Sequence, residues 1–263
     1  MTITFHEPRL KQFLAIPFEH QAFAYAKAPQ NWVRSMGLEG VDFADILPAA
    51  AQSREDVRQL CRNEDFTLMY RYICVMAWGN QGAGKSRKHA QRAWRARERL
   101  TPILAAIAAG ACSRAEAYAL FCGVGAVAGL GPSYFTKLIY FFWPDERCYI
   151  MDQWTAKSIN YLYGEKLVPM TGGYVATSTD GRHYERYCQA VELLAGLTDG
   201  RERLSGSQTE MRLFCHGGRS PGPWRKIIRE HDRLQATSNK QQAQAIITKT
   251  IPNEMLKLTG NGS

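Results

Sequence analysis

The sequence predicts an all-α fold, and two observations support this. Segments that alternate strictly between apolar and polar residues, as half-buried strands do, are almost absent. Apolar residues instead recur at helical spacing, between residues that start and stop helices. With 263 residues, of which 45% are hydrophobic and 22% charged, the chain has the composition of a compact globular protein.

Helices are expected first at residues 20–30 and 54–62. Residues 66–78 form an apolar run that is long enough for a buried helix, although its β-branched and aromatic residues leave a strand open. Thr101-Pro102 has the order of an N-cap and a first-turn proline and predicts a helix over 103–109. Ser113-x-x-Glu116 is a capping box that opens the next helix, through about Phe121.

The second half predicts five more helices, over residues 133–143, 153–163, 184–197, 210–216 and 224–234. Glycine, threonine and serine make residues 166–181 a predicted loop. The segment after Ala236 is expected to be a loosely attached tail.

The charge of the chain favours a polyanionic partner. It has 33 Lys and Arg against 24 Asp and Glu, a net charge of +9, which favours nucleic acid. No apolar run reaches the roughly 18 residues of a membrane span, and the first residues lack the order of a signal peptide, so a cytoplasmic protein is expected. The seven cysteines are irregularly spaced with no Cys-x-x-Cys, so we expect reduced thiols, no metal site and no cofactor.

Residues 127–133, VAGLGPS, have the pattern of a hairpin between two helices. Gly129 and Gly131 bracket Leu130 and allow a tight turn with positive φ angles. The helix that begins near Ser133 would then point free N–H groups at a DNA phosphate. The alternative is an ordinary helix–turn–helix corner in a packed core.

Asp152 follows nineteen residues after Ser133, behind apolar residues and at the start of a predicted helix. This order of hairpin, helix, turn and aspartate resembles the helix–hairpin–helix DNA glycosylases, most closely the compact 8-oxoguanine type. The resemblance covers residues 117–160. It implies a two-lobed helical domain over residues 1–235 with a tail at 236–263, acting as a monomer in the repair of duplex DNA that carries a damaged or modified base. A role in defence against phage DNA is left open and is not implied by the resemblance.

By this resemblance Asp152 is the catalytic carboxylate. Cleavage of an N-glycosidic bond builds positive charge on the deoxyribose, and a fixed anion stabilises that charge. The alternative is that Asp152 only caps its helix.

In relatives that also cleave the strand, a lysine nucleophile stands at the position of Ser133. Its replacement by serine implies base excision with water as the nucleophile. Lys137 lies one helical turn further and is a candidate for a displaced nucleophile or a pocket residue, with lyase activity left open. Its alternative is a solvated or phosphate-contacting side chain. Most nearby aromatic residues belong to a buried stripe, and Tyr134 and Trp154 are the candidates to hold an extruded base.

Residues 79–86, GNQGAGKS, satisfy the phosphate-loop pattern of nucleotide triphosphatases. That fold needs a strand before the loop and an apolar helix after it, but residues 85–99 are so basic that hardly any face could pack on a sheet. We therefore expect Lys85, Arg87 and Lys88 to contact the DNA backbone. A solvated basic helix, a triphosphatase and a non-catalytic DNA-binding protein remain the alternatives.

Overall fold

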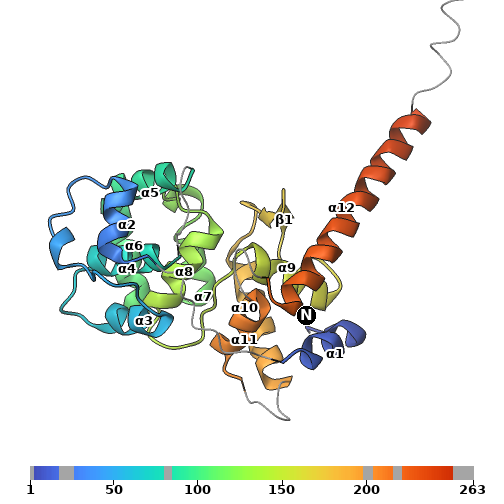
Figure 1. Ribbon diagram of the computed structural model, residues 1–263, viewed down its shortest axis with the longest axis horizontal. Coiled ribbons are helices and arrows are strands. Elements are labelled where there is room, and N and C mark those ends of the chain that lie inside the picture. The colour runs from blue at the N-terminus through green and yellow to red at the C-terminus, as the bar shows by residue number, and fades with distance from the viewer. Residues whose placement is uncertain (1–2, 18–26, 80–84, 198–203, 216–220, 251–263) are drawn as a thin grey trace, which may run out of the picture.

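The computed structural model describes residues 3–17, 27–79, 85–197, 204–215 and 221–250. Helices make up most of this part of the chain, which confirms the predicted all-α class (Figure 1). The β structure within these ranges is one short antiparallel hairpin, β1 (Met170–Thr171) and β2 (Tyr174–Val175). No helix in the described ranges is both long and apolar enough to span a membrane.

Figure 1 shows two groups of helices side by side. The first group contains α2 (Pro29–Met36), α3 (Arg54–Arg62), α4 (Leu68–Gly79), α5 (Lys85–Arg95), α6 (Arg97–Ala108), α7 (Arg114–Ala119) and α8 (Pro132–Phe142). The second group contains α1 (Glu7–Ala15), α9 (Gln153–Tyr163), α10 (Gly181–Leu197), α11 (Gly206–Phe214), α12 (Pro223–Thr250) and the β-hairpin.

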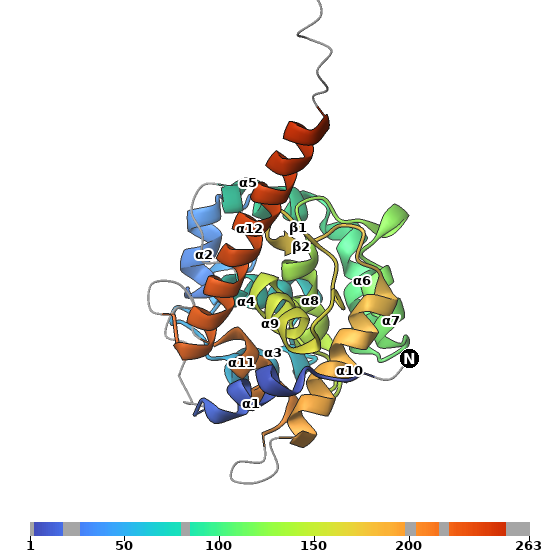
Figure 2. The same ribbon diagram turned by 90° about the vertical axis from the view of Figure 1, so that its right-hand side faces the viewer.

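The start of the chain belongs to the second group. The Phe13 ring of α1 meets the Trp224 ring of α12 edge to face, with centroids 4.8 Å apart. Arg9 donates from Nη1 to the carbonyl oxygen of Tyr161 in α9 (2.8 Å). The chain therefore begins in one group, builds the other from α2 to α8, and returns, as Figure 2 shows from the side of α1 and α12.

Two central helices, α4 and α8, form the core of the first group. The apolar run predicted as helix or strand is helix α4, and its residues from Tyr70 to Ala77 are buried. A helix that is apolar on all sides has to be surrounded, which explains why the run shows little helical periodicity. The predicted stripe of α8 is buried as well, at Phe135, Leu138, Ile139 and Phe142.

Polar contacts join the two groups. Arg54 at the start of α3 forms an ion pair with Glu210 of α11, and both side chains are almost fully buried. The hydroxyl of Tyr140 in α8 shares a hydrogen bond with that of Ser207 in α11 (2.8 Å). The faces that these contacts join carry charge, so the junction is more than an apolar seam.

Local helix signals are confirmed at several places. Residues 54–62 and 153–163 are helical with the predicted bounds. Ser113 caps α7 through the predicted capping box with Glu116. These boundaries are set by neighbouring residues, so the sequence alone predicts them.

The expected start of a helix at Thr101-Pro102 is wrong. Helix α6 begins at Arg97, and Pro102 lies inside it. Buried residues at helical spacing, from Leu100 to Ile107, hold the helix together across the proline, and the Thr101 hydroxyl donates to the Arg97 carbonyl oxygen (2.9 Å). Tertiary burial here outweighs the local preference of proline for a first turn.

Other boundaries also differ from expectation, since α10 begins at Gly181 instead of 184 and α11 at Gly206 instead of 210. The helix expected at 20–30 begins at Pro29, while residues 18–26 lie outside the described ranges. The predicted loop 166–181 contains the β-hairpin, whose turn has positive φ angles at Gly172 and Gly173. Helix α12 does not end near residue 234 but continues to Thr250, and its distal part extends away from the body (Figures 1 and 2).

Candidate functional site

The predicted hairpin connects a short 3₁₀ turn (Gly123–Gly125) to α8. Gly129 has a φ of +92°, as the tight turn requires. Gly131 has a φ of −89°, so the expectation of a positive φ at both glycines is wrong at the second one. Leu130 is buried beneath the turn, where it anchors the hairpin.

The start of α8 has the form of an anion site. Gly131 is the N-cap, and Pro132 occupies the first helical turn, where its missing N–H costs nothing. The amide of Ser133 makes no backbone hydrogen bond to another described residue. A DNA phosphate at this helix end would meet that amide and the positive end of the helix dipole.

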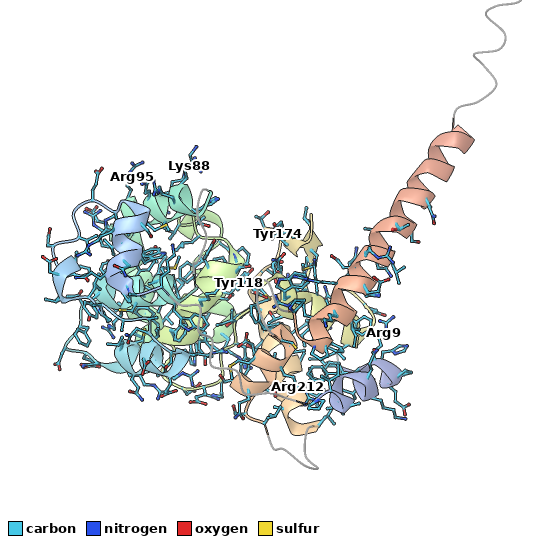
Figure 3. The ribbon with its side chains drawn as sticks, viewed as in Figure 1. Arg9, Lys88, Arg95, Tyr118, Tyr174 and Arg212 are labelled. Atoms are coloured by element: carbon cyan, nitrogen blue, oxygen red, sulfur yellow. The ribbon has the colours of Figure 1, made fainter. Side chains whose placement is uncertain are left out.

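Helix α5 packs directly against the hairpin. A Cβ built on Gly129 would lie 2.2 Å from the carbonyl oxygen of His89, so only glycine allows this approach. The outward-facing basic residues of α5 are Arg87, Lys88, His89, Arg92 and Arg95. Figure 3 shows Lys88 and Arg95 pointing away from the body of the protein. The hairpin, which has no charged side chain, thus packs on the helix that carries these cations, and we call the two together the basic surface.

The individual residues expected on this surface differ in their surroundings. Lys88 is exposed, and Arg87 is exposed but donates from Nε to the carbonyl oxygen of Ser35 (3.0 Å). The side chain of Lys85 lies outside the described part of the structure. The expectation that hardly any face of this segment could pack is wrong, because Ala90, Ala93 and Trp94 are buried. Two alanines and one tryptophan therefore give this basic helix a narrow apolar stripe through which it packs.

The glycine-rich segment lacks the setting of a phosphate loop. The residues before it form helix α4, which runs to Gly79, whereas a triphosphatase loop follows a strand. Such an enzyme also needs a later apolar strand that ends in a magnesium-binding aspartate, and the apolar segment before Asp145, which could have supplied it, is helix α8. The triphosphatase alternative therefore lacks both strands that it needs; residues 80–84 of the loop itself are outside the described ranges.

Asp152 is the N-cap of α9. Its Oδ1 accepts hydrogen bonds from the backbone N–H groups of Trp154 (2.7 Å) and Thr155 (3.0 Å). The Thr155 hydroxyl in turn accepts from the Asp152 N–H (3.0 Å), which completes a capping box. Among the described residues, no hydrogen bond is made to Oδ2. Capping fixes the carboxylate and leaves one of its oxygens available.

Lys137 lies on α8 close to the end of α4. A Cβ on Gly79 would stand 2.4 Å from the Lys137 Cδ, so the first glycine of GNQGAGKS makes room for the lysine stem. The ammonium donates to the carbonyl oxygen of Ser133 (2.6 Å). Burial lowers the pKa of Lys137, and the charges of Asp152 and Glu210 partly oppose this effect. An amine with a lowered pKa is more readily neutral and nucleophilic.

One hydrogen bond brings the neighbourhoods of Lys137 and Asp152 together. The backbone N–H of Met151 donates to the hydroxyl of Thr136 (3.1 Å), and each residue adjoins one of the two candidates. Arg54 and Glu210 contribute further charge to this region, since both influence the pKa of Lys137. Burial raises the pKa of Glu210, while the Arg54 guanidinium opposes that change. Two cations and two carboxyl groups thus meet at the junction of the helix groups.

The two aromatic candidates are placed differently. Tyr134 is partly buried and its ring centroid lies 5.5 Å from the Lys137 Nζ, beside the charged cluster. Trp154 is contacted by three cations, with Arg225 at 4.6 Å, Lys157 at 4.9 Å and Arg229 at 5.4 Å from its ring centroid. A base stacked on Trp154 would therefore compete with guanidinium groups of the same chain.

Three charged residues of this region were not predicted. Arg54 and Glu210 are 156 positions apart, and Arg225 lies on a third helix. Their helical spacing matches that of ordinary surface residues, so no sequence signal distinguishes them. Only the packing of α3 and α11 against α8 makes them part of the junction.

A family model described as "Putative 8-oxoguanine DNA glycosylase OGG-like protein" matches residues 18–214. This match covers the hairpin, Lys137, Asp152 and the junction between the helix groups. No curated protein and no solved structure matched the chain significantly. Since the matched residues form well over half of the sequence, the chain belongs to this OGG-like DNA glycosylase family.

Proposed function

We propose that this protein is a DNA glycosylase that extrudes a damaged or modified base and hydrolyses its N-glycosidic bond with Asp152. The observation that carries the proposal is the placement of Asp152. Its carboxylate is fixed by two backbone N–H groups, keeps one oxygen without a described partner, and lies at the junction beside Lys137. Family membership supports the general class of activity.

The basic surface of the hairpin and α5 would hold the duplex. The free amide of Ser133 and the dipole of α8 bind one phosphate, and the exposed cations of α5 bind others without recognising sequence. This arrangement leaves the base to be selected at the junction between the helix groups. Tyr134, beside Lys137, is the better placed of the two aromatic candidates to stack on that base.

In the reaction, the bond between C1′ and the base nitrogen breaks as positive charge develops on the sugar. The Asp152 carboxylate stabilises that charge electrostatically. A water molecule then forms the new C1′–O bond, Asp152 takes up its proton, and that proton passes on to the nitrogen of the departing base, which restores the carboxylate. With serine at position 133, water is the simplest nucleophile for this chain.

Lys137 offers a second route for the same bond cleavage. Its neutral amine would attack C1′, displace the base, and form an imine with the opened sugar, from which strand cleavage follows. The lowered pKa of Lys137 supports this route, whereas its hydrogen bond to the Ser133 carbonyl has to break first.

The test is mass-spectrometric detection of free bases released from duplexes that carry oxidised, alkylated or hypermodified bases. Wild type should release one class of base, and Asp152→Asn should release it at least about a hundredfold more slowly. Asparagine is as good an N-cap as aspartate, so the melting temperature of this variant should stay close to that of wild type. Equal release by both proteins would refute the role of Asp152.

A non-catalytic DNA-binding protein is the second candidate, because the capping box gives Asp152 a sufficient structural reason to be present. Under that function, wild type releases no base from any duplex. Asp152→Asn would then bind DNA with the affinity of wild type, and substitution of the α5 cations would affect binding alone.

A further inference from the structure

A cationic patch lies at the start of α12, beside Asp152. Arg225 and Arg229 are one helical turn apart, and both guanidinium groups lie near the Trp154 ring, at 4.6 and 5.4 Å from its centroid. Lys157 approaches the same ring to 4.9 Å. The charge of Asp152 acts on the pKa of Arg225, so the buried member of the patch lies within electrostatic reach of the proposed catalytic carboxylate.

The charge of this patch is only partly compensated. Lys157 is neutralised by an ion pair with Asp232 (2.7 Å). Arg225 is 2% exposed and donates from Nε and Nη2 to the carbonyl oxygen of Phe214, which carries no net charge. Arg229 is exposed and forms no ion pair with a described residue. The positive charges of Arg225 and Arg229 are therefore not neutralised by an ion pair with a described carboxylate.

The pKa of Arg225 agrees with the lack of a carboxylate partner. Burial lowers its pKa to about 10, and the neighbouring charge of Arg229 acts in the same direction. The charge of Asp152 opposes the change without cancelling it. Like charges one turn apart on a helix repel each other, and burying a guanidinium without a carboxylate partner is costly. An external anion would relieve both penalties.

The shape of the patch favours phosphate. Guanidinium groups match the oxygen geometry of a phosphate and bind it with charge-assisted hydrogen bonds. Contact with the Trp154 ring restricts both guanidinium groups, so less side-chain freedom is lost when the anion binds.

The patch and the hairpin lie in different helix groups. Helix α12 packs on α9, in the second group, whereas the hairpin and α5 belong to the first group (Figure 1). Asp152, the N-cap of α9, belongs to the same group as the patch and influences the pKa of Arg225. A duplex lying across the junction would meet the patch with the backbone beyond the extruded nucleotide.

We propose that Arg229, supported by Arg225, binds a DNA backbone phosphate that flanks the nucleotide held at Asp152. This inference rests on the proposed function, since it places DNA at Asp152. Together with the hairpin, the site would hold the backbone at two points and keep the sugar between them in line with the carboxylate.

The first test measures binding of a duplex with a stable abasic-site analogue over a range of salt concentrations. Arg229→Ala should bind about tenfold more weakly, as expected for one charge-assisted contact, and the slope of log K against log salt should fall by about 1. Arg229→Lys keeps the charge and should keep most of the slope. Arg233→Ala is the matched control, because Arg233 lies on the same helix but is paired with Glu230 (2.6 Å).

The second test locates the phosphate. Single phosphates near the lesion are replaced by neutral methylphosphonates, and each duplex is bound by wild type and Arg229→Ala. At one flanking position the two proteins should bind the substituted duplex equally, because the methylphosphonate has already removed the charge that Arg229 contacts. At the other positions Arg229→Ala should bind more weakly than wild type. If Arg229→Ala binds every duplex like wild type, or loses the same factor on all of them, the proposed site is wrong.

Base release by wild type is measured in parallel, so that the two proposals fail separately. Suppose that wild type releases no base, but Arg229→Ala binds DNA more weakly and the difference disappears at one methylphosphonate position. The proposed glycosylase function then fails and the phosphate site stands. If wild type releases a base and Arg229→Ala binds like wild type, the function stands and the site fails. A wild type that does not bind DNA overturns both.

Discussion

Gly129 lies so close to His89 that a Cβ on the glycine would stand 2.2 Å from the His89 carbonyl oxygen. The φ of +92° at Gly129 also disfavours any other residue. The hairpin and the basic helix α5 can thus pack this closely only because residue 129 has no side chain. Their combined surface depends on this contact.

Gly129→Ala should therefore damage both stability and DNA binding. Backbone strain and the clash with α5 should lower the free energy of unfolding by about 1–3 kcal/mol. Gly131→Ala is the control for stability, because Gly131 has a negative φ and a Cβ there would have no atom within 4 Å. Urea denaturation and DNA titration measure the two effects. Unchanged stability of Gly129→Ala would contradict the close contact.

The exposed cations of α5 should contribute to DNA affinity without changing which base is released. Lys88→Ala and Arg95→Ala should each lower the slope of log K against log salt by about 1, on damaged and undamaged duplexes alike. Lys11→Ala is a control on α1, in the other helix group, where Lys11 is exposed and paired with Glu7. If Lys11→Ala reduces the slope as much, general charge rather than the α5 surface accounts for binding.

The amine of Lys137 can be detected chemically. If it attacks C1′, borohydride should trap wild type on DNA with an abasic site, whereas Lys137→Gln should not be trapped and the exposed control Lys166→Gln should be. The neutral amine forms as the pH rises, and because burial lowers the pKa of Lys137, trapping should level off below the ordinary lysine pKa of about 10.4. Base release without trapping would assign the reaction to water instead.

The sequence predicted those features of the fold and the site that depend on neighbouring residues. The capping box at Ser113, the hairpin at Gly129 and the helix that begins after Asp152 have local signals and are confirmed as structural elements. Pro102 misled the prediction because buried residues on both sides extend α6 past it. Local preference decided the boundary only where tertiary burial did not oppose it.

The charged junction could not be predicted in the same way. Glu210 and Arg54 meet because α11 packs near α3, and nothing in either helix indicates its partner. Gly79 belongs to a segment that matches a phosphate-loop pattern, yet its contact is the stem of Lys137. The role of Gly79 depends on which helix lies opposite, and the local pattern does not indicate that helix.

The Arg54–Glu210 ion pair should be among the most sensitive contacts of the molecule. Their side chains are 12% and 3% exposed, and Arg54 Nε also donates to the Tyr140 hydroxyl (2.8 Å). Glu210→Ala leaves a buried guanidinium without its carboxylate, which should lower the free energy of unfolding by about 3–5 kcal/mol.

Glu55→Ala, on the exposed side of the same helix α3, should change the free energy of unfolding by less than about 0.5 kcal/mol. Chemical denaturation of Arg54→Ala, of Glu210→Ala and of the double variant Arg54→Ala/Glu210→Ala measures the coupling between the two partners. The double variant should be less destabilised than the sum of its single variants, because it leaves neither charge buried alone. If the two losses simply add, the pair does not hold the two helix groups together, and their junction depends on apolar packing.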